Sequence, residues 1–396
     1  MTEMSSRAET LVPLRLAAGN AHPRLKWTEG MSFKLPLGVL TSTGLIIRLD
    51  KTGFLSVPEE LPPIAAEAVE GLRLRAAFIE QKRVNSGLLF SYRLAPPRIR
   101  SLAASLIGTF KRCSVHRWAS FPMWPLDLSA DLLSDLAQGP VSPFADGPTP
   151  VILTHDLDSK EGLDGLVERF LPIEEGFVAR SVNFVVPRAY MIDHRKLDGL
   201  VARGCILGIH GYDHSCRTPF CSEADCRARL SAAGELIDIY GIRGYRAPSL
   251  LRTPLLLREL AFLYDYDSSI PTSGGLFPVP NNGCASARPF RCQGIVEIPL
   301  SMPRDGSLLF LGYSAALILE TWFACANAIS KSGGVVVLLT HCEKRFSGNS
   351  AMLKIYSQFL EFISTSEQFF FATPEEVLRK AFPRTQKSEP EYSNER

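Results

Sequence analysis

The sequence lacks a marked excess of either charge, because 43 lysine and arginine residues stand against 41 aspartate and glutamate residues, for a net charge of +2. Nucleic-acid binding usually needs a clear basic surplus, so we expect no nucleic-acid partner. Long apolar runs are also missing. The N-terminal segment holds no apolar core of the length that a secretory signal needs. The most apolar long window, Leu308–Ile329, carries Glu320 near its middle, which favours a buried strand and helix over a transmembrane segment.

A disulfide framework is absent as well. Nine cysteines, an odd number, are scattered along 396 residues, whereas disulfide scaffolds are short and rich in paired cysteines. Reduced cysteines fit a soluble cytoplasmic protein, which is the location we expect. Cys216, Cys221 and Cys226 are spaced by fives, unlike the close cysteine pairs of zinc sites, so a second metal there is a weak hypothesis.

The chain is long enough for two or three domains, or for one large α/β domain with an appendage. Residues 1–140 are the expected appendage, an N-terminal α+β region whose role the sequence does not give. Within it the pattern predicts strands at Phe33–Leu40, Gly44–Leu49 and Gly87–Tyr92, and helices at Pro97–Arg112 and Ser129–Leu136. Gly139–Pro150, rich in proline and glycine, is the expected linker. The polar residues 383–396 are expected to form a disordered tail.

Residues 150–382 alternate between short apolar runs and longer amphipathic runs, which predicts parallel βα units. About seven units suit a barrel better than an open sheet, so the expected fold is α/β, a distorted (β/α)7 barrel. The predicted strands are Val151–Leu157, Ser181–Val186, Ile206–His210, Gly244–Ala247, Tyr264–Ser268, Ile295–Leu300 and Gly334–His341. The predicted helices are Leu163–Phe177, Arg195–Arg203, Glu223–Tyr240, Thr253–Leu263, Ile318–Lys331, Ala351–Ser364 and Pro374–Lys380.

Unusual polar residues fall where five of these strands end, and barrel enzymes place their sites at the carboxyl ends of the strands. Four of the seven histidines in the chain occur there. We therefore expect one common site on this rim. The five polar segments are Thr154–Asp158, His210–His214, Tyr245–Pro248, Asp265–Ser269 and Thr340–Glu343.

Asp158, His210 and His214 have the residue types of a metal site. Two imidazoles four residues apart can face one ion if the backbone between them makes a helical turn. One carboxylate completes a set of two histidines and one carboxylate, which leaves coordination positions open for water and substrate. These ligands suit zinc, and also cobalt, iron or nickel. The plainer alternative is two histidines in a solvated loop.

Three further residues are candidates for catalysis. Asp156 is two residues from Asp158 and points the same way in a regular strand, so it can accept a proton from a water activated at the metal. Arg246 can hold that base in its charged form. His341 can donate a proton to a departing amine, because imidazole titrates near working pH. The alternatives are a surface salt bridge for Arg246 and a packed histidine for His341. His155 points away from Asp156 and is expected to be structural.

These segments, in this order, resemble the motifs of the polysaccharide deacetylase family, the carbohydrate esterases with a NodB homology domain. The likeness covers roughly residues 150–380. The matching segments are Thr154–Ser159 (THDLDS), His210–His214 (HGYDH), Arg246–Pro248 (RAP), Asp267–Ser269 (DSS) and Leu339–His341 (LTH). The family has two adjacent aspartates, whereas Leu157 separates them here, and Gly211 replaces a serine. Ser159 and Lys160 replace a glycine and a proline. These departures suggest a divergent THDxD subgroup.

The resemblance implies metal-dependent removal of an acetyl group, most often N-acetyl, from a sugar or saccharide. It assigns Asp156 as the base, Asp158, His210 and His214 as metal ligands, Arg246 as the residue that orients the base, and His341 as the acid. The spacing leaves open which of Asp156 and Asp158 is base and which is ligand. Two alternatives are an amidohydrolase acting on a non-sugar amide and a barrel that binds saccharide without turnover. The substrate, the native metal and the oligomeric state are not given by the sequence.

The segment Trp118–Asp131 has two tryptophans and two prolines before the barrel. It is expected to be plain packing, with a sugar-stacking lid as the alternative.

Overall fold

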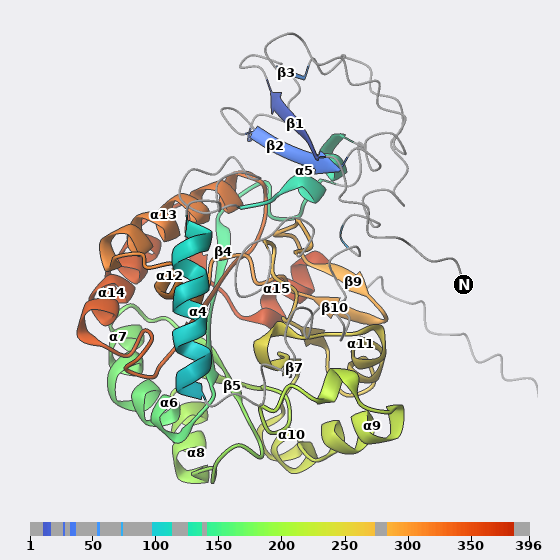
Figure 1. Ribbon diagram of the computed structural model, residues 1–396, viewed down its shortest axis with the longest axis vertical. Helices are drawn as coiled ribbons and strands as arrows, with labels where there is room; N and C mark the ends of the chain where they lie inside the picture. The colour runs from blue at the N-terminus through green and yellow to red at the C-terminus, as the bar shows by residue number, and fades with distance from the viewer. Residues whose placement is uncertain are drawn as a thin grey trace, which may run out of the picture.

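The molecule has a curled sheet with helices packed outside it, as Figure 1 shows for the computed structural model. The structure describes residues 11–16, 27, 32–36, 54–55, 73, 97–112, 126–136, 141–273 and 283–383. Within these residues, no helix is long and apolar enough to cross a membrane.

The curled sheet is the predicted (β/α)7 barrel. Seven of its strands follow the order β11-β4-β5-β6-β7-β8-β10, and every neighbouring pair among them is parallel. The seven strands are β4 (Thr149–Leu157), β5 (Ser181–Val185), β6 (Ile206–Ile209), β7 (Gly244–Tyr245), β8 (Tyr266–Asp267), β10 (Ile295–Glu297) and β11 (Val336–His341).

The barrel departs from a regular cylinder at two places. Strands β10 and β11 do not pair with each other. Irregular chain after β10 closes the barrel there, and the N–H of Met302 donates to the carbonyl oxygen of Val337 at 3.1 Å. Two short strands lie beside the seven. β9 (Phe290–Cys292) lies antiparallel to β10, and β12 (Phe369–Phe371) pairs with the start of β4.

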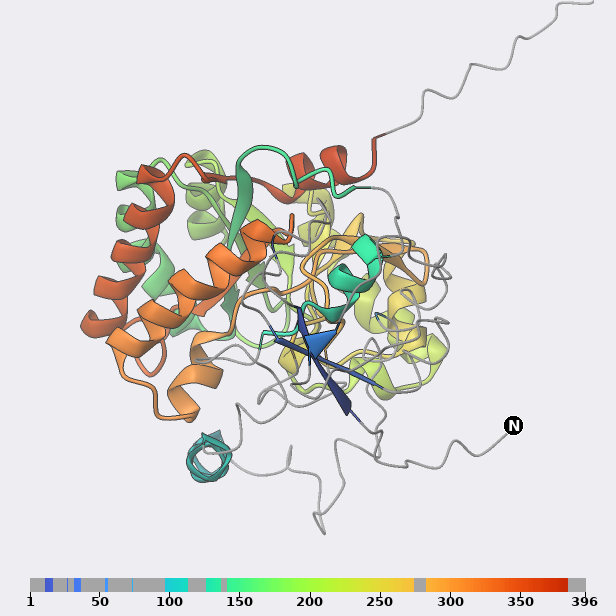
Figure 2. The same ribbon diagram turned by 90° about the horizontal axis from the view of Figure 1, so that it is seen from above.

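Helices pack on the outer face of the barrel, and every predicted helix is present (Figures 1 and 2). Two predicted helices are divided into shorter ones, and the apolar window 308–329 forms two helices, α12 and α13, instead of a strand and a helix. The bounds are α6 (Lys160–Gly165), a π-helix (Leu166–Phe170), α7 (Leu171–Gly176), α8 (His194–Ala202), α9 (Glu223–Ser231), α10 (Gly234–Tyr240), α11 (Pro254–Leu260), α12 (Asp305–Phe310), α13 (Ala315–Lys331), α14 (Ser350–Thr365) and α15 (Pro374–Ala381).

Alternation along β4 sets the direction of each functional side chain. Val151 and Leu153 belong to the apolar core between the sheet and the helices, whereas Ile152 belongs to a second core inside the barrel. Because strand side chains alternate, Thr154 and Asp156 continue the inner row and His155 the outer row. Burying a large apolar side chain contributes about 1.5–3 kcal/mol to stability. A shift of β4 by one residue in register would exchange its inner and outer side chains and lose several such contributions.

The described part of the N-terminal region contains a small sheet of order β2-β1-β3. β1 (Leu11–Leu16) was not predicted, β2 (Ser32–Pro36) matches the strand expected at Phe33–Leu40, and β3 spans Phe54–Leu55. Helices α4 (Pro97–Arg112) and α5 (Ser129–Leu136) have the predicted bounds. The strands expected at Gly44–Leu49 and Gly87–Tyr92 lie outside the described residues.

Part of the expected linker is packed against the barrel. Phe144 is buried in the inner core, and the Ser142 hydroxyl donates to the carbonyl oxygen of Gly333 at 2.6 Å. Among the described residues of the tryptophan-rich segment, Leu126 and Leu128 are buried, as expected for packing. The tail from residue 384 lies outside the described residues.

Candidate metal centre

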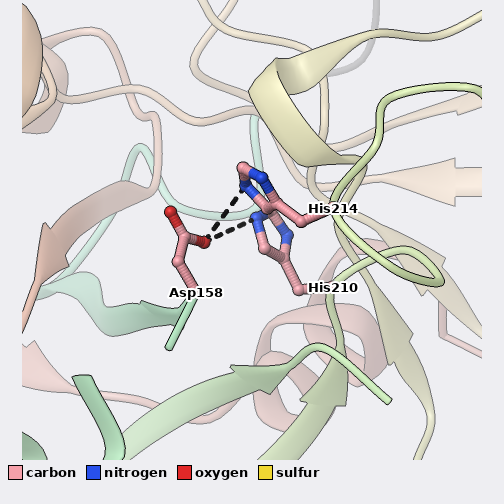
Figure 3. A group of neighbouring side chains, drawn as sticks. All are labelled: Asp158, His210 and His214. Atoms are coloured by element: carbon pink, nitrogen blue, oxygen red, sulfur yellow. Dashed lines mark ion pairs between the residues drawn. The ribbon is translucent and has the colours of Figure 1, made fainter. Parts of the chain in front are cut away.

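Asp158, His210 and His214 converge at the carboxyl-terminal rim of the barrel, where Figure 3 shows the three side chains facing one another. Asp158 directly follows β4, and His210 directly follows β6. The Oδ1 atom of Asp158 lies 3.4 Å from Nε2 of His210 and 3.3 Å from Nε2 of His214. Burial raises the pKa of Asp158, but the neighbouring imidazoles His214 and His210 outweigh it and hold this pKa well below its usual range.

The ring of His210 is fixed by its other nitrogen. Nδ1 lies 3.0 Å from the carbonyl oxygen of Arg246. A carbonyl oxygen only accepts, so Nδ1 carries the proton and donates. In a neutral ring, Nε2 then directs its lone pair toward Asp158.

His214 reaches the same point without a helical turn, which corrects the reason given for the spacing of the two histidines. The loop instead uses left-handed backbone at Gly211 (φ +69°) and His214 (φ +56°). A side chain at Gly211 would also place its Cβ 2.4 Å from the ring of Pro248. The glycine that departs from the family pattern is therefore required by both the backbone angle and the space.

The three residues fit a divalent cation. Oδ1 of Asp158 is buried and accepts no hydrogen bond, which is costly for a carboxylate oxygen without a cation partner. Ligands that are 2.0–2.1 Å from a tetrahedral zinc ion are about 3.3–3.4 Å apart. The two distances from Oδ1 of Asp158 to the imidazoles match this separation. Among the described residues, Asp158, His210 and His214 form the group of side chains whose ligand atoms lie close enough together to hold one metal ion.

Asp156 lies beside this triad but has a different partner. Its Oδ1 accepts from Nη1 of Arg246 at 2.9 Å, and its Oδ2 is 3.5 Å from Nε2 of His210. Burial raises the pKa of Asp156, but His210, Arg246 and His341 outweigh it, so this pKa is lowered. Asp156 is thus an ionised carboxylate with one oxygen held and the other directed toward the triad.

Arg246 is fully buried, so it is not the surface salt bridge of the alternative reading. Its guanidinium donates to Thr154 Oγ1 at 2.9 Å, to the carbonyl oxygen of Ser268 at 3.0 Å and to Ser268 Oγ at 3.1 Å, in addition to Asp156. It also stacks 4.2 Å from the ring centre of Phe184. The strand end at Asp267–Ser269 contributes through Ser268. Asp267 itself is outside the site, because its Oδ1 accepts from Ser269 and its strand position alternates away from the barrel interior.

His341 lies beside Asp156, because the two residues are register partners in the β11–β4 pair. Its Nδ1 is 2.8 Å from Oδ1 of Asp305, the first residue of α12. The backbone N–H of His341 and the hydroxyl of Ser347 both donate to Oδ2 of Asp305 at 2.7 Å. Burial lowers the pKa of His341, but Asp305 outweighs it and raises this pKa to about 10. Sequence reasoning missed Asp305, although a lone aspartate after Pro303-Arg304 was a possible signal.

Two other polar groups support the rim without facing the triad. Ser159 caps α6 and donates to Oε1 of Glu343 at 2.7 Å, so the serine that replaces a family glycine ties the Asp158 loop to β11. His155 points outward as predicted. Its ring contacts Glu174 at 2.7 Å and Thr340 at 2.9 Å, so it is part of the outer core.

No family model matches this chain, and no curated protein matches it. Solved structures are similar. A chain described as a polysaccharide deacetylase from Mycobacterium smegmatis is 22% identical, with a TM-score of 0.49 over 60% of this chain and 91% of that one. Puue allantoinase is 17% identical, with a TM-score of 0.48 over 67% of this chain and 99% of that one. A CE4 family pseudoenzyme from Bacillus anthracis is 14% identical, with a TM-score of 0.40 over 59% and 66%.

Polysaccharide deacetylases, the family that the motifs resemble, are thus found among the similar solved structures. At these identities and TM-scores the likeness carries no conclusion about substrate or activity. The assignment to a THDxD subgroup stays a prediction.

Proposed function

We propose that this protein is a metal-dependent hydrolase that removes an acetyl group, most often N-acetyl, from a sugar or saccharide-containing substrate. The observation that carries the proposal is the convergence of three units on one rim. These are the ligand triad Asp158–His210–His214, the general base Asp156 with its partner Arg246, and the general acid His341 with its partner Asp305.

The triad would hold one divalent cation. Zinc is the best fit to two imidazoles and a carboxylate, with cobalt, iron and nickel as alternatives. When bound, the cation polarises the acetyl carbonyl and makes a coordinated water more acidic. We assign Asp158 as a ligand because its Oδ1 accepts no hydrogen bond and faces both imidazoles.

Asp156 would act as the general base. Arg246 occupies Oδ1 and leaves Oδ2 directed toward the triad, so one oxygen is oriented and the other can take a proton from water. The lowered pKa keeps this carboxylate ionised at neutral pH, which a base requires. Four hydrogen bonds on a fully buried guanidinium keep Arg246, and hence the base, in one orientation.

His341 would act as the general acid. Asp305 holds its Nδ1, and the other ring nitrogen is left to donate a proton to the departing amine or alcohol. The raised pKa keeps the ring protonated at neutral pH, as an acid requires. The acid and base are register partners across the β11–β4 pair, so the base would act on the attacking water and the acid on the leaving group of one scissile bond.

The first alternative is an amidohydrolase that acts on a non-sugar amide, since the same residues can hydrolyse any amide that fits the rim. The second is a barrel that binds saccharide without turnover. The buried Asp156–Arg246 and His341–Asp305 pairs speak against the second, because binding alone does not need an oriented base and a charged acid.

Elemental analysis of the purified protein tests the proposal first. We expect about one equivalent of zinc or another transition metal in the wild type and none in His210→Ala/His214→Ala. His194→Ala is the matched control, because it removes an exposed imidazole that contacts Tyr240 and is not one of the three candidate ligands. Amine release from N-acetyl sugars then separates the sugar deacetylase from the amidohydrolase. Equal metal in wild type and double variant, or no metal after reconstitution, would reject the metal centre.

A further inference from the structure

Helix α4 (Pro97–Arg112) carries a row of large apolar side chains on its solvent-facing side. The exposed fractions are 57% for Ile99, 64% for Leu102, 56% for Leu106, 48% for Ile107 and 82% for Phe110. The other exposed large apolar residues in the described part of the chain are distributed over several elements. Single exposed apolar residues are normal, but a contiguous patch indicates an interaction surface.

The opposite side of α4 is the one that packs. Ala104 is buried, and a Cβ added at Gly108 would lie 1.9 Å from the carbonyl oxygen of Phe310. At 100° per residue, Gly108 lies about half a turn from Ile99, Leu106 and Phe110. Small residues thus dock α4 against α12, and the large ones face away from the body. Figure 2 shows α4 end-on at the periphery of the molecule.

The attachment of α4 is reinforced at its C-terminal end. Arg112 donates from Nη1 to the carbonyl oxygen of Gly312 at 3.1 Å and lies 5.5 Å from the ring centre of Tyr313. The helix is therefore held in place while its apolar side is exposed within the described part of the chain. The docking partner α12 begins with Asp305, the residue that holds His341. Helix α12 therefore contacts the packed side of α4 and also carries Asp305, the partner of His341.

The charge of α4 indicates which kind of partner binds this face. Its sixteen residues, PRIRSLAASLIGTFKR, contain four basic residues and no acidic residue. Helices that lie in the surface of a bilayer combine a large apolar face with lysine and arginine at its flanks. At 100° per residue, positions 98 and 100 lie about 80° from Gly108 on either side, so these two arginines border the apolar face and would meet anionic lipid headgroups. Arg112 is held by Gly312 instead. With sixteen residues α4 is too short to span a bilayer.

We propose that α4 is an interfacial helix that binds the surface of an anionic lipid bilayer through Ile99, Leu102, Leu106, Ile107 and Phe110. This inference does not depend on the proposed hydrolase activity.

The test is flotation of the full-length protein with two kinds of vesicle, pure phosphatidylcholine and a mixture containing one third phosphatidylglycerol. We expect the wild type to float with the anionic vesicles, and this fraction to fall as salt is raised. Leu106→Glu/Phe110→Glu should weaken binding at least about tenfold, since two large side chains leave the lipid and two negative charges oppose it.

Ile239→Glu/Phe262→Glu is the matched control. Ile239 is 57% exposed and Phe262 is 79% exposed, close to the values for Leu106 and Phe110. This control should bind anionic vesicles as the wild type does. Amide hydrogen exchange of the wild type provides a second measurement that needs no variant. Anionic vesicles should increase protection over residues 97–112.

Three results would overturn the proposal. The first is a wild type that floats with neither vesicle. The second is a Leu106→Glu/Phe110→Glu variant that binds as tightly as the wild type. The third is a wild-type dimer that this variant converts to a monomer without any vesicle binding, which would assign the face to a second copy of the chain. His210→Ala/His214→Ala should lose metal and still float, so failure of the hydrolase proposal and failure of this one are separate results.

Discussion

Nδ1 of His341 lies 2.8 Å from Oδ1 of Asp305, although 36 residues separate the two along the chain. Asp305 also accepts hydrogen bonds from the backbone of His341 and from Ser347, so both carboxylate oxygens are occupied. The histidine is thereby fixed in orientation and in charge. The structure ties the protonation of His341 to a carboxylate on a different element.

Replacing Asp305 with asparagine should lower the pKa of His341 from about 10 toward its ordinary value of 6.5. A histidine acid is active when protonated, so the alkaline limb of the kcat/KM profile should move to lower pH. Activity at pH 7 should fall about fourfold, because a histidine of pKa 6.5 is only about one quarter protonated there. The pH profile and a histidine NMR titration measure this. Ser347→Ala is the control, because it removes one hydrogen bond and keeps the carboxylate. An unchanged alkaline limb in Asp305→Asn would contradict the acid role.

The two aspartates should separate metal binding from turnover. Asp158→Asn should reduce metal content and activity together, because Asp158 faces both imidazoles. Asp156→Asn should keep the metal and lose about 10²- to 10⁴-fold in kcat, the usual contribution of a general base. Elemental analysis measures the metal content of each variant, and kinetics on the same preparations measure its kcat. Loss of metal in Asp156→Asn alone would exchange the two roles.

Arg246 should be a main determinant of stability as well as of the site. Arg246→Ala leaves the buried Asp156 carboxylate unpaired, which should cost about 3–5 kcal/mol in the free energy of unfolding. Arg246→Lys should recover only part of this, since an ammonium group cannot reproduce the planar donors. Urea denaturation measures the effect. Arg243→Ala, an exposed residue 3.7 Å from Asp265, should change the free energy by less than about 0.5 kcal/mol. Equal effects of Arg246→Ala and Arg243→Ala would refute the argument.

The outer network around His155 should make stability depend on pH. Glu174 is buried and accepts from Ser181 and Tyr356, in addition to its contact with His155. Burial raises the pKa of Glu174, but His155 and the hydroxyl donors outweigh it and lower this pKa from 4.5. A lowered pKa stabilises the folded state above the unfolded value and loses that contribution as pH falls below it.

The wild type should therefore be more stable than Glu174→Gln at pH 7, by about 3 kcal/mol. This difference should shrink as the pH is lowered below about 4. Chemical denaturation of both proteins across this range is the measurement. Glu175→Gln, at the exposed neighbouring residue, should leave stability nearly unchanged. A difference that stays constant with pH would show that the carboxylate charge of Glu174 is not the source.

Gly211→Ser should weaken the metal centre even though the related motif has serine there. The φ of +69° at Gly211 disfavours any side chain, and the added Cβ would meet Pro248 at 2.4 Å. Displacing this loop moves His214, so metal affinity should fall at least about tenfold. Competition with a chelator measures it. Gly199→Ser, in α8 with no atom within 4 Å of the added Cβ, is the matched control. Wild-type affinity in Gly211→Ser would show that the loop adapts.

Residues 150–382 reveal much of their structure in the sequence itself, because strand and helix periodicities are local. Apolar runs on β4 and β11 located the strands, and the i, i+2 rule placed Asp156 and His155 on opposite faces. Parallel strands end at one rim, so polar strand ends predicted which side chains would meet. The outward direction of Asp267 follows from the same alternation, but the exact strand boundary was needed to see it.

Contacts between distant segments were decided by the tertiary structure. Asp305 became the partner of His341 because α12 packs beside β11, and no local pattern encodes that distance. The left-handed loop at Gly211 came from its fit against Pro248, a residue 37 positions away. The periodicity of Pro97–Arg112 predicted a helix, but only its packing through Ala104 and Gly108 determined that the large apolar side faces outward. Local sequence fixed the elements and their faces, and long-range packing decided which faces meet.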